Sequence, residues 1–191
     1  MIFEPVHPYI SPAHRVKFAT EAWETRGAAA LRHDVFCREQ GIFSGDDRDA
    51  IDAIAIPIVA LSDNCGQSDE VVGTVRIHDA GADVWWGSRL AVAKPYRRQV
   101  GLGTSLIRLA VSSAHARGCK RFLAHVQSRN ALLFQRLHWE TLEETLIHGH
   151  PHHFMQADLA FYPPILDGAA GFVAKGVARP AAEARTVGSA A

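Results

Sequence analysis

A glycine-containing loop between a strand and a long helix is the feature that most constrains the fold of this chain. Residues 84–92 are rich in strand-forming residues, and residues 101–117 have helical spacing that ends at Gly118. The run RQVGLG from Arg98 to Gly103 joins them. Glycines let consecutive backbone N–H groups turn toward one point, and the following helix adds unpaired amides and a positive dipole end. The pattern predicts a pyrophosphate site, although a tight structural turn would look the same.

The loop departs from two common nucleotide-binding patterns. A Rossmann fingerprint needs a third glycine where the chain has Leu106, and an acidic residue after the next strand, where His125, Gln127 and Ser128 stand. The Lys-Ser/Thr pair of a P-loop is also missing. A dinucleotide or ATP site is therefore disfavoured.

Charge is divided unevenly along a chain that is neutral in total. The 191 residues include 20 Lys and Arg and 20 Asp and Glu, yet residues 84–139 hold ten basic residues and no acidic one. This basic segment suits a polyanionic ligand. A solvated basic face or a nucleic-acid patch is the alternative, but the segment offers few exposed-looking aromatic residues for base stacking.

The remaining patterns predict one mixed α/β domain with a central mixed, mostly antiparallel sheet flanked by helices. Gly27 and several alanines suggest that the first helical region is split. The expected strands are 16–19, 51–61, 71–78, 84–92, 122–126, 139–147 and 154–161, and the expected helical regions are 20–40, 101–117 and 130–137.

We expect residues 1–167 to form the domain and residues 168–191 to be a flexible tail, because that stretch contains nine Ala and four Gly with few large apolar side chains. The first 16 residues lack the apolar core of a secretory signal, and no apolar run is long enough for a transmembrane helix. Three distant cysteines without a CxxC pair fit reduced thiols. These observations predict a cytoplasmic protein without a membrane partner.

Several of these motifs together resemble the GNAT (Gcn5-related N-acetyltransferase) superfamily over roughly residues 14–162. The resemblance lies in Leu90-Ala-Val92, the R-x-x-G-x-G run, Asn130, Phe134 and the segment 137–139. It implies acetyl-CoA as donor, with the pyrophosphate on the loop amides and the pantetheine arm paired with the strand. The implied cofactor-binding residues are Leu90, Ala91, Val92, Arg97, Arg98, Gln99, Val100, Gly101, Leu102, Gly103, Thr104, Asn130 and Phe134.

Two departures and one further likeness accompany this resemblance. The span from Leu90 to Gly101 is one residue longer than the common pattern, and Phe134 replaces a tyrosine that protonates the leaving thiolate in many relatives. Another group or water would then supply the proton, or the thiolate would leave unprotonated. The stretch from Leu31 to Gly41 is similar to GNAT proteins related to acyl-homoserine-lactone synthases.

Direct transfer needs a neutral amine, whose deprotonation costs about 4–5 kcal/mol at pH 7 for a lysine-like group. Glu39, His78 and His125 are the candidate bases, although a helix-end acid, a turn histidine and a core histidine are their ordinary interpretations. A backbone N–H of the central strand, near Val92, would polarise the thioester carbonyl.

Two clusters of polar residues are candidates for binding the acceptor or a metal ion. Asp46 and Asp47, with Asp49 and Asp52, either hold a cationic amine or form a solvated loop; beside the cleft they would favour a polyamine or amino-acid-like acceptor. The four histidines between His148 and His153 lack the spacing of a common zinc site, so a turn is favoured and no metal is expected.

The sequence therefore predicts a cytoplasmic acetyl-CoA-dependent N-acetyltransferase that acts on the primary amine of a small molecule. Its alternatives are a non-catalytic CoA-binding regulatory module, an acyl-homoserine-lactone-type synthase using S-adenosylmethionine, and a basic nucleic-acid binder. Homodimer formation is left open.

Overall fold

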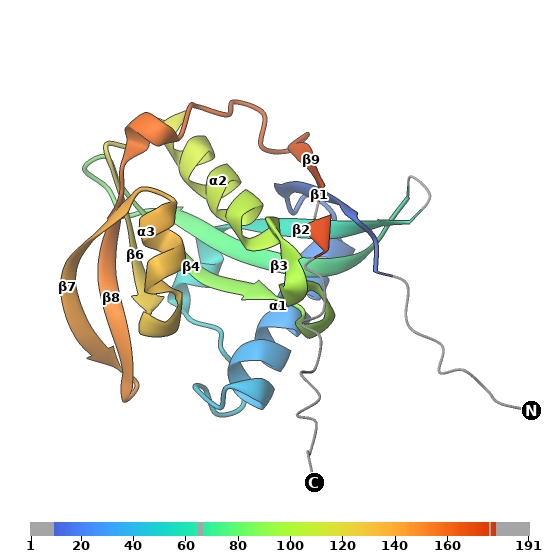
Figure 1. Cartoon of the computed structure of the whole chain (residues 1–191), viewed down its shortest axis with the longest axis horizontal. Helices are drawn as coiled ribbons and strands as arrows, with labels where there is room; N and C mark the ends of the chain where they lie inside the picture. Colours follow the sequence, from blue (N-terminus) through green and yellow to red (C-terminus); the bar gives the residue numbers. More distant parts are fainter. Residues whose placement is uncertain (1–9, 65–66, 176, 179–191) are drawn as a thin grey trace, which may run out of the picture.

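The computed structural model describes residues 10–64, 67–175 and 177–178 of the chain, and its centre is an eight-stranded sheet (Figure 1). The strands lie in the order β7-β8-β6-β4-β3-β2-β1-β9. Every neighbouring pair is antiparallel except β4 and β6, which are parallel. This mixed sheet confirms the predicted fold class. The strands are β1 (Ala13–Phe18), β2 (Ile56–Asn64), β3 (Gln67–Asp79), β4 (Val84–Val92), β6 (Arg121–Gln127), β7 (Trp139–Ile147), β8 (His150–Ala157) and β9 (Phe172–Lys175).

Helices cover both faces of the sheet. The helix α1 (Ala22–Arg32) continues into a π-helix (His33–Glu39) and packs on one face, while α2 (Leu102–His115) lies across the other (Figure 1). The short α3 (Ala131–Arg136) packs beside β7. None of the helices in the described ranges is long and apolar enough to cross a bilayer.

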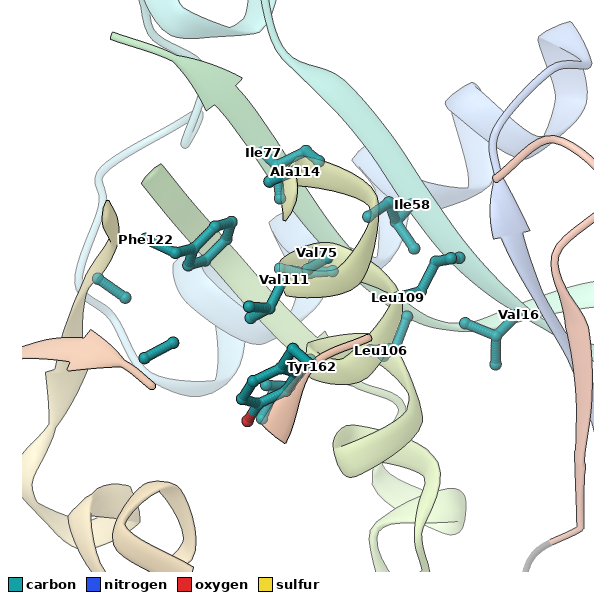
Figure 2. Close-up of a cluster of buried hydrophobic side chains, with 14 of the residues drawn as sticks. Val16, Ile58, Val75, Ile77, Leu106, Leu109, Val111, Ala114, Phe122 and Tyr162 are labelled. Atoms are coloured by element: carbon teal, nitrogen blue, oxygen red, sulfur yellow. The ribbon is translucent and has the colours of Figure 1, made fainter. Parts of the chain in front are cut away.

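Alternation along the central strands supplies a separate core for each face. In β2, Ile58 packs with the α2 side chains, including Leu106 and Leu109, whereas its neighbour Val59 packs with Leu31 of α1. Figure 2 shows the larger of these clusters, which gathers around α2. Because both faces are buried, the sheet is held rigidly where it carries the site.

Several predicted elements differ in their bounds from the structure; the expected strand 51–61, for example, begins in a 3₁₀ helix (Ala50–Ala53), and β2 starts only at Ile56. The first helical region changes from α to π geometry at His33, and Gly27 lies inside α1 without breaking it. The predicted bounds 154–161 of the last strand are wrong, since β8 covers His150–Ala157. It begins early because His148 and Gly149 both have positive φ, which permits a tight two-residue hairpin after β7.

The C-terminal segment corrects the expected tail. The amide of Phe18 donates to the carbonyl of Gly168 at 2.7 Å, β9 pairs with β1, and β10 (Val177–Ala178) pairs with β5 (Gln99–Val100). The expectation of a flexible tail from residue 168 is therefore wrong for the described residues up to 178. Backbone pairing to an open sheet edge needs few large side chains, so composition does not reveal it. The rest of the expected tail, 179–191, lies outside the described residues.

Candidate active site

The site begins where the two parallel strands of the sheet separate. β4 pairs with β6 only from Val84 to Trp86, and from Gly87 onward its free edge faces a gap. A β-bulge lies in the same stretch, because Arg89 and Leu90 together oppose the single residue Val75 of β3. Arg89 has a φ of 56°, in the left-handed region that costs a non-glycine residue about 1 kcal/mol or more. The bulge and the separation leave backbone N–H and C=O groups of β4 without strand partners.

A cavity of about 270 Å³ fills the gap between β4 and β6 and reaches both faces of the sheet. Its first part, which we call the donor end, lies toward α2 and α3. Residues lining the donor end are Ile107, Ala110, Val111, Phe122, Asn130, Phe134 and Trp139. Its second part, the acceptor end, lies toward the π-helix and the β7–β8 turn. Residues lining the acceptor end are Phe36, Gln40, Ile42, Phe43, Trp86, Arg89, His125, Gln127, Ile147, His148 and His152.

Of the predicted cofactor-binding set, Leu90, Asn130 and Phe134 line the cavity, the last two at the donor end. Phe134 is only 6% exposed and its ring packs edge-on against Trp139, with centroids 5.0 Å apart. A phenyl ring has no acidic proton, so this position cannot protonate a thiolate. It serves as an apolar wall.

The glycine loop precedes α2 and lies outside the cavity lining. Gly101 has a φ of 107° and forms the N-cap of α2, and a Cβ placed on Gly101 or Gly103 would meet open space. The first amides of an α-helix have no intrahelical partner, so the amides of this turn remain available to an anion. Since a helix rises 1.5 Å per residue, the loop lies about 7 Å along α2 from the cavity-lining Ile107.

The two arginines beside the loop differ in their contacts, and the predicted role of Arg97 needs correction. Arg97 is not a mobile cation: its Nε donates to the carbonyl of Val92 at 2.8 Å, and its guanidinium forms a two-pronged ion pair with Glu39. This contact also occupies the Val92 carbonyl, so the free edge of β4 extends from Gly87 to Ala91. Arg98, by contrast, is exposed and forms no ion pair within the described part of the chain.

The acceptor end is built by segments that are distant in the sequence. The π-helix and the residues after it carry Phe36, Gln40 and Phe43, and Gln127 of β6 donates to the side-chain oxygen of Gln40 at 3.0 Å. The Phe43 ring lies 5.2 Å from His148 and 4.4 Å below the Arg89 guanidinium. These contacts place the end of the π-helix against the β7–β8 turn and enclose this end of the cavity.

Of the three predicted bases, His125 alone lines the cavity. It stands on β6 beside Trp86 and Phe154, whose ring centroids are 5.2 and 5.3 Å away and which stack on each other. It is exposed, so the interpretation as a core histidine is wrong. Partial burial, followed by the nearby His152, lowers the pKa of His125, while Glu143 acts in the opposite direction. The imidazole is consequently neutral at pH 7 and able to accept a proton.

The other two predicted bases are placed differently. The hydrogen bond from Arg97 lowers the pKa of Glu39, and this paired carboxylate is a poor proton acceptor. His78 pairs with Trp86 across β3 and β4 but is absent from the cavity lining. Burial, and then Arg76, lowers its pKa, which leaves it neutral but away from the cavity.

The acidic loop is likewise used by the fold rather than presented to the cavity. Asp47 is 2% exposed and accepts hydrogen bonds from the Nε atoms of Arg32 and Arg89 at 2.7 and 3.1 Å. Its carboxylate is buried, paired with two arginines and absent from the cavity lining, so its position does not support the predicted substrate-binding role. Asp46 is exposed, lies 3.6 Å from Arg48 and is also absent from the cavity lining.

Several residues of the site escaped sequence reasoning. One is Trp86, which lines the cavity, whereas its neighbour Trp85 is buried in the core. Arg89, Gln40 and Phe43 had no local signal, because a bulge and a π-helix bring them to the cavity. Within the described ranges, no group of three or more His, Cys, Asp or Glu is arranged to hold a metal ion.

The fold that carries this cavity is shared with several solved structures. A comparison with curated proteins gives no match. Among solved structures, a Lactobacillus plantarum protein assigned to the N-acetyltransferases is 23% identical with a TM-score of 0.67, covering 75% of this chain and 97% of the other. Escherichia coli ElaA is 19% identical with a TM-score of 0.64, covering 76% and 98%.

A third likeness is to BjaI, a CoA-dependent acyl-homoserine lactone synthase solved with S-adenosylmethionine and isopentyl-CoA. It is 14% identical with a TM-score of 0.62, and the match covers 76% of this chain and 83% of BjaI. At these identities the three likenesses establish a shared fold. The sequence itself matches the acetyltransferase (GNAT) family over residues 18–139, and the chain belongs to that family.

Proposed function

We propose that the protein transfers the acetyl group of acetyl-CoA directly to the primary amine of a small molecule. The observation that carries this proposal is the separation of β4 and β6, which opens a cavity to both faces of the sheet near the glycine-containing start of α2. One face can admit a thioester and the other an amine. The proposal also rests on membership of a family of acetyltransferases.

The donor would bind along α2 and β4. The amides at the start of α2 and the exposed Arg98 would hold the pyrophosphate, and the two amide groups of pantetheine would pair with the free edge of β4. Asn130 would bond the arm where it enters the cavity, beside Phe134. These roles leave the thioester near the bulge at Arg89.

The transfer would proceed in two bond changes. The amine nitrogen attacks the thioester carbonyl carbon, its proton passes to the neutral His125 directly or through water, and an unpaired N–H of the bulge stabilises the oxyanion. Collapse breaks the carbon–sulfur bond and releases CoA as its thiolate. The lack of a proton donor at Phe134 does not prevent this step, because the thiolate of a thiol with a pKa near 8.5 is an adequate leaving group.

Calorimetry with acetyl-CoA tests donor binding, and thiol release against a panel of amines tests transfer. Gly101→Glu should weaken binding at least tenfold, because a carboxylate would repel the pyrophosphate. Gly81→Glu is the matched control, since Gly81 also has positive φ and open space around it but lies on a remote turn. Equal affinity of both variants would show that the loop is only structural.

The role of His125 has its own test. His125→Gln should lower kcat/KM about 10²-fold or more and remove the acidic limb of its pH profile, which lies below pH 6.5 because the pKa of His125 is lowered. An unchanged profile in this variant would exclude His125 as the base. Tight CoA binding without thiol release from any amine would favour the regulatory module instead.

A further inference from the structure

The acceptor end of the cavity differs from what a cationic substrate would require. None of the residues lining the cavity is an aspartate or glutamate, and the two charged ones are Arg89 and Arg129. Neutral polar side chains such as Gln40 and Gln127 and three histidines also line the cavity, and Phe36, Phe43 and Trp86 are the largest apolar side chains at this end. A polyamine would bring further positive charges next to an arginine without a carboxylate to pair with them.

The nearby acidic loop supplies no free negative charge to the cavity, because its carboxylates at Asp47, Asp49 and Asp52 are paired with arginines. Beyond the Asp47 contacts, Asp49 accepts two hydrogen bonds from Arg76 at 2.8 and 2.7 Å, and Asp52 pairs with Arg32 and Arg76. Three carboxylates thus face three guanidinium groups. Glu143 influences His125 electrostatically but does not line the cavity.

Arg89 also retains hydrogen-bonding capacity toward a ligand. Its Nε and Nη2 atoms donate to Asp47 and Asp49, whereas Nη1 has no acceptor within the described residues. The side chain is 18% exposed, borders the cavity and lies over the Phe43 ring. A free guanidinium nitrogen beside an aromatic wall is suited to a carboxylate attached to an apolar group.

We propose that the acceptor is an amino acid with a large apolar or aromatic side chain, whose carboxylate binds Arg89 and whose side chain packs against Phe43 and Phe36. The inference rests on the proposed transfer reaction. It narrows the sequence-based expectation, which allowed both polyamines and amino-acid-like amines. A neutral α-amine would then lie between Arg89 and His125, which border the same end of the cavity.

The test compares ligands on the wild-type protein, so no variant has to fold. Calorimetry on protein saturated with CoA would use L-phenylalanine, L-phenylalaninamide, 2-phenylethylamine and putrescine. We expect L-phenylalanine to bind at least tenfold more tightly than both analogues that lack the carboxylate, and putrescine to bind most weakly. Equal affinity of the amide, or tighter binding of putrescine, would overturn the inference.

A pair of variants checks the location of the acceptor. Phe43→Ala should weaken L-phenylalanine binding severalfold, whereas Phe161→Ala, a truncation of an exposed ring that does not line the cavity, should leave it unchanged. Identical affinities of the two variants would place the ligand elsewhere and contradict the inference.

Thiol release separates this inference from the proposed reaction. Preferred binding of L-phenylalanine without thiol release would support the substrate class while contradicting the transfer reaction. Thiol release that is fastest with putrescine would support transfer while contradicting the substrate class.

Discussion

Replacement of Asp47 by asparagine tests whether the acidic loop is structural. Asp47 is buried and accepts hydrogen bonds from Arg32 and Arg89, so the substitution removes a negative charge between the buried Arg32 and the partly buried Arg89. It also presents an amide that can donate toward the guanidinium groups. Asp46 is exposed, and Asp46→Asn makes the same chemical change one residue away.

The expected magnitude follows from the contacts that remain. Breaking a buried ion pair costs about 3–5 kcal/mol, and the lower end applies because Arg32 keeps Asp52 and Arg89 keeps Asp49. We therefore expect Asp47→Asn to lower the free energy of unfolding by about 3 kcal/mol. An exposed pair contributes about 0–1 kcal/mol, so Asp46→Asn should lower it by less than about 1 kcal/mol.

Urea unfolding followed by circular dichroism measures both effects. With an m-value of about 2 kcal/mol per molar, the midpoint of Asp47→Asn should fall by about 1.5 M while the slope stays constant. Equal midpoints for the two variants would refute the structural role of Asp47. A midpoint unchanged from wild type, together with a loss of amine binding, would restore its role as a substrate anchor.

Three further predictions concern pH, the C-terminal segment and the core. The hydrogen bonds from Arg76 lower the pKa of Asp49, and those from Arg32 and Arg76 outweigh burial and lower the pKa of Asp52. The stability that these two ionised carboxylates contribute should be present above about pH 4 and be lost as the pH falls further. The melting temperature should fall over the same pH range. Gly171→Ala should cost about 1–3 kcal/mol in urea unfolding, more than Gly45→Ala, since both have positive φ but a Cβ at Gly171 would collide with backbone; equal costs would contradict the packing of this turn. Leu106→Ala should cost about 3 kcal/mol because the side chain is fully buried, and a cost below 1 kcal/mol would contradict that packing.

Periodicity predicted most of the fold because strands with one or two buried faces repeat regularly. The bounds of β4 and β7 agree with the expected 84–92 and 139–147. The short strands β5, β9 and β10 were missed. Their pairing depends on backbone groups of distant segments, and no local pattern records such a partner.

The candidate site was predictable only where chemistry is carried by local sequence. The glycine loop and Asn130 were found because a turn before a helix and a family motif are contiguous. The ion pairs of Glu39 and Asp47 could not be predicted, because their arginine partners lie far away in the sequence. His125 was underestimated because the separation of two strands, which exposes it, is a tertiary property.

The pairing of β10 with β5 has a practical consequence for work on this protein. β5 leads directly into the glycine loop, so a segment 13 residues from the C-terminus is paired with the strand that enters this loop. A fusion partner or surface linkage at that end would apply its load to the strand beside the loop. Immobilisation through the C-terminus should therefore distort measured CoA affinities, and a comparison with protein free in solution would reveal it.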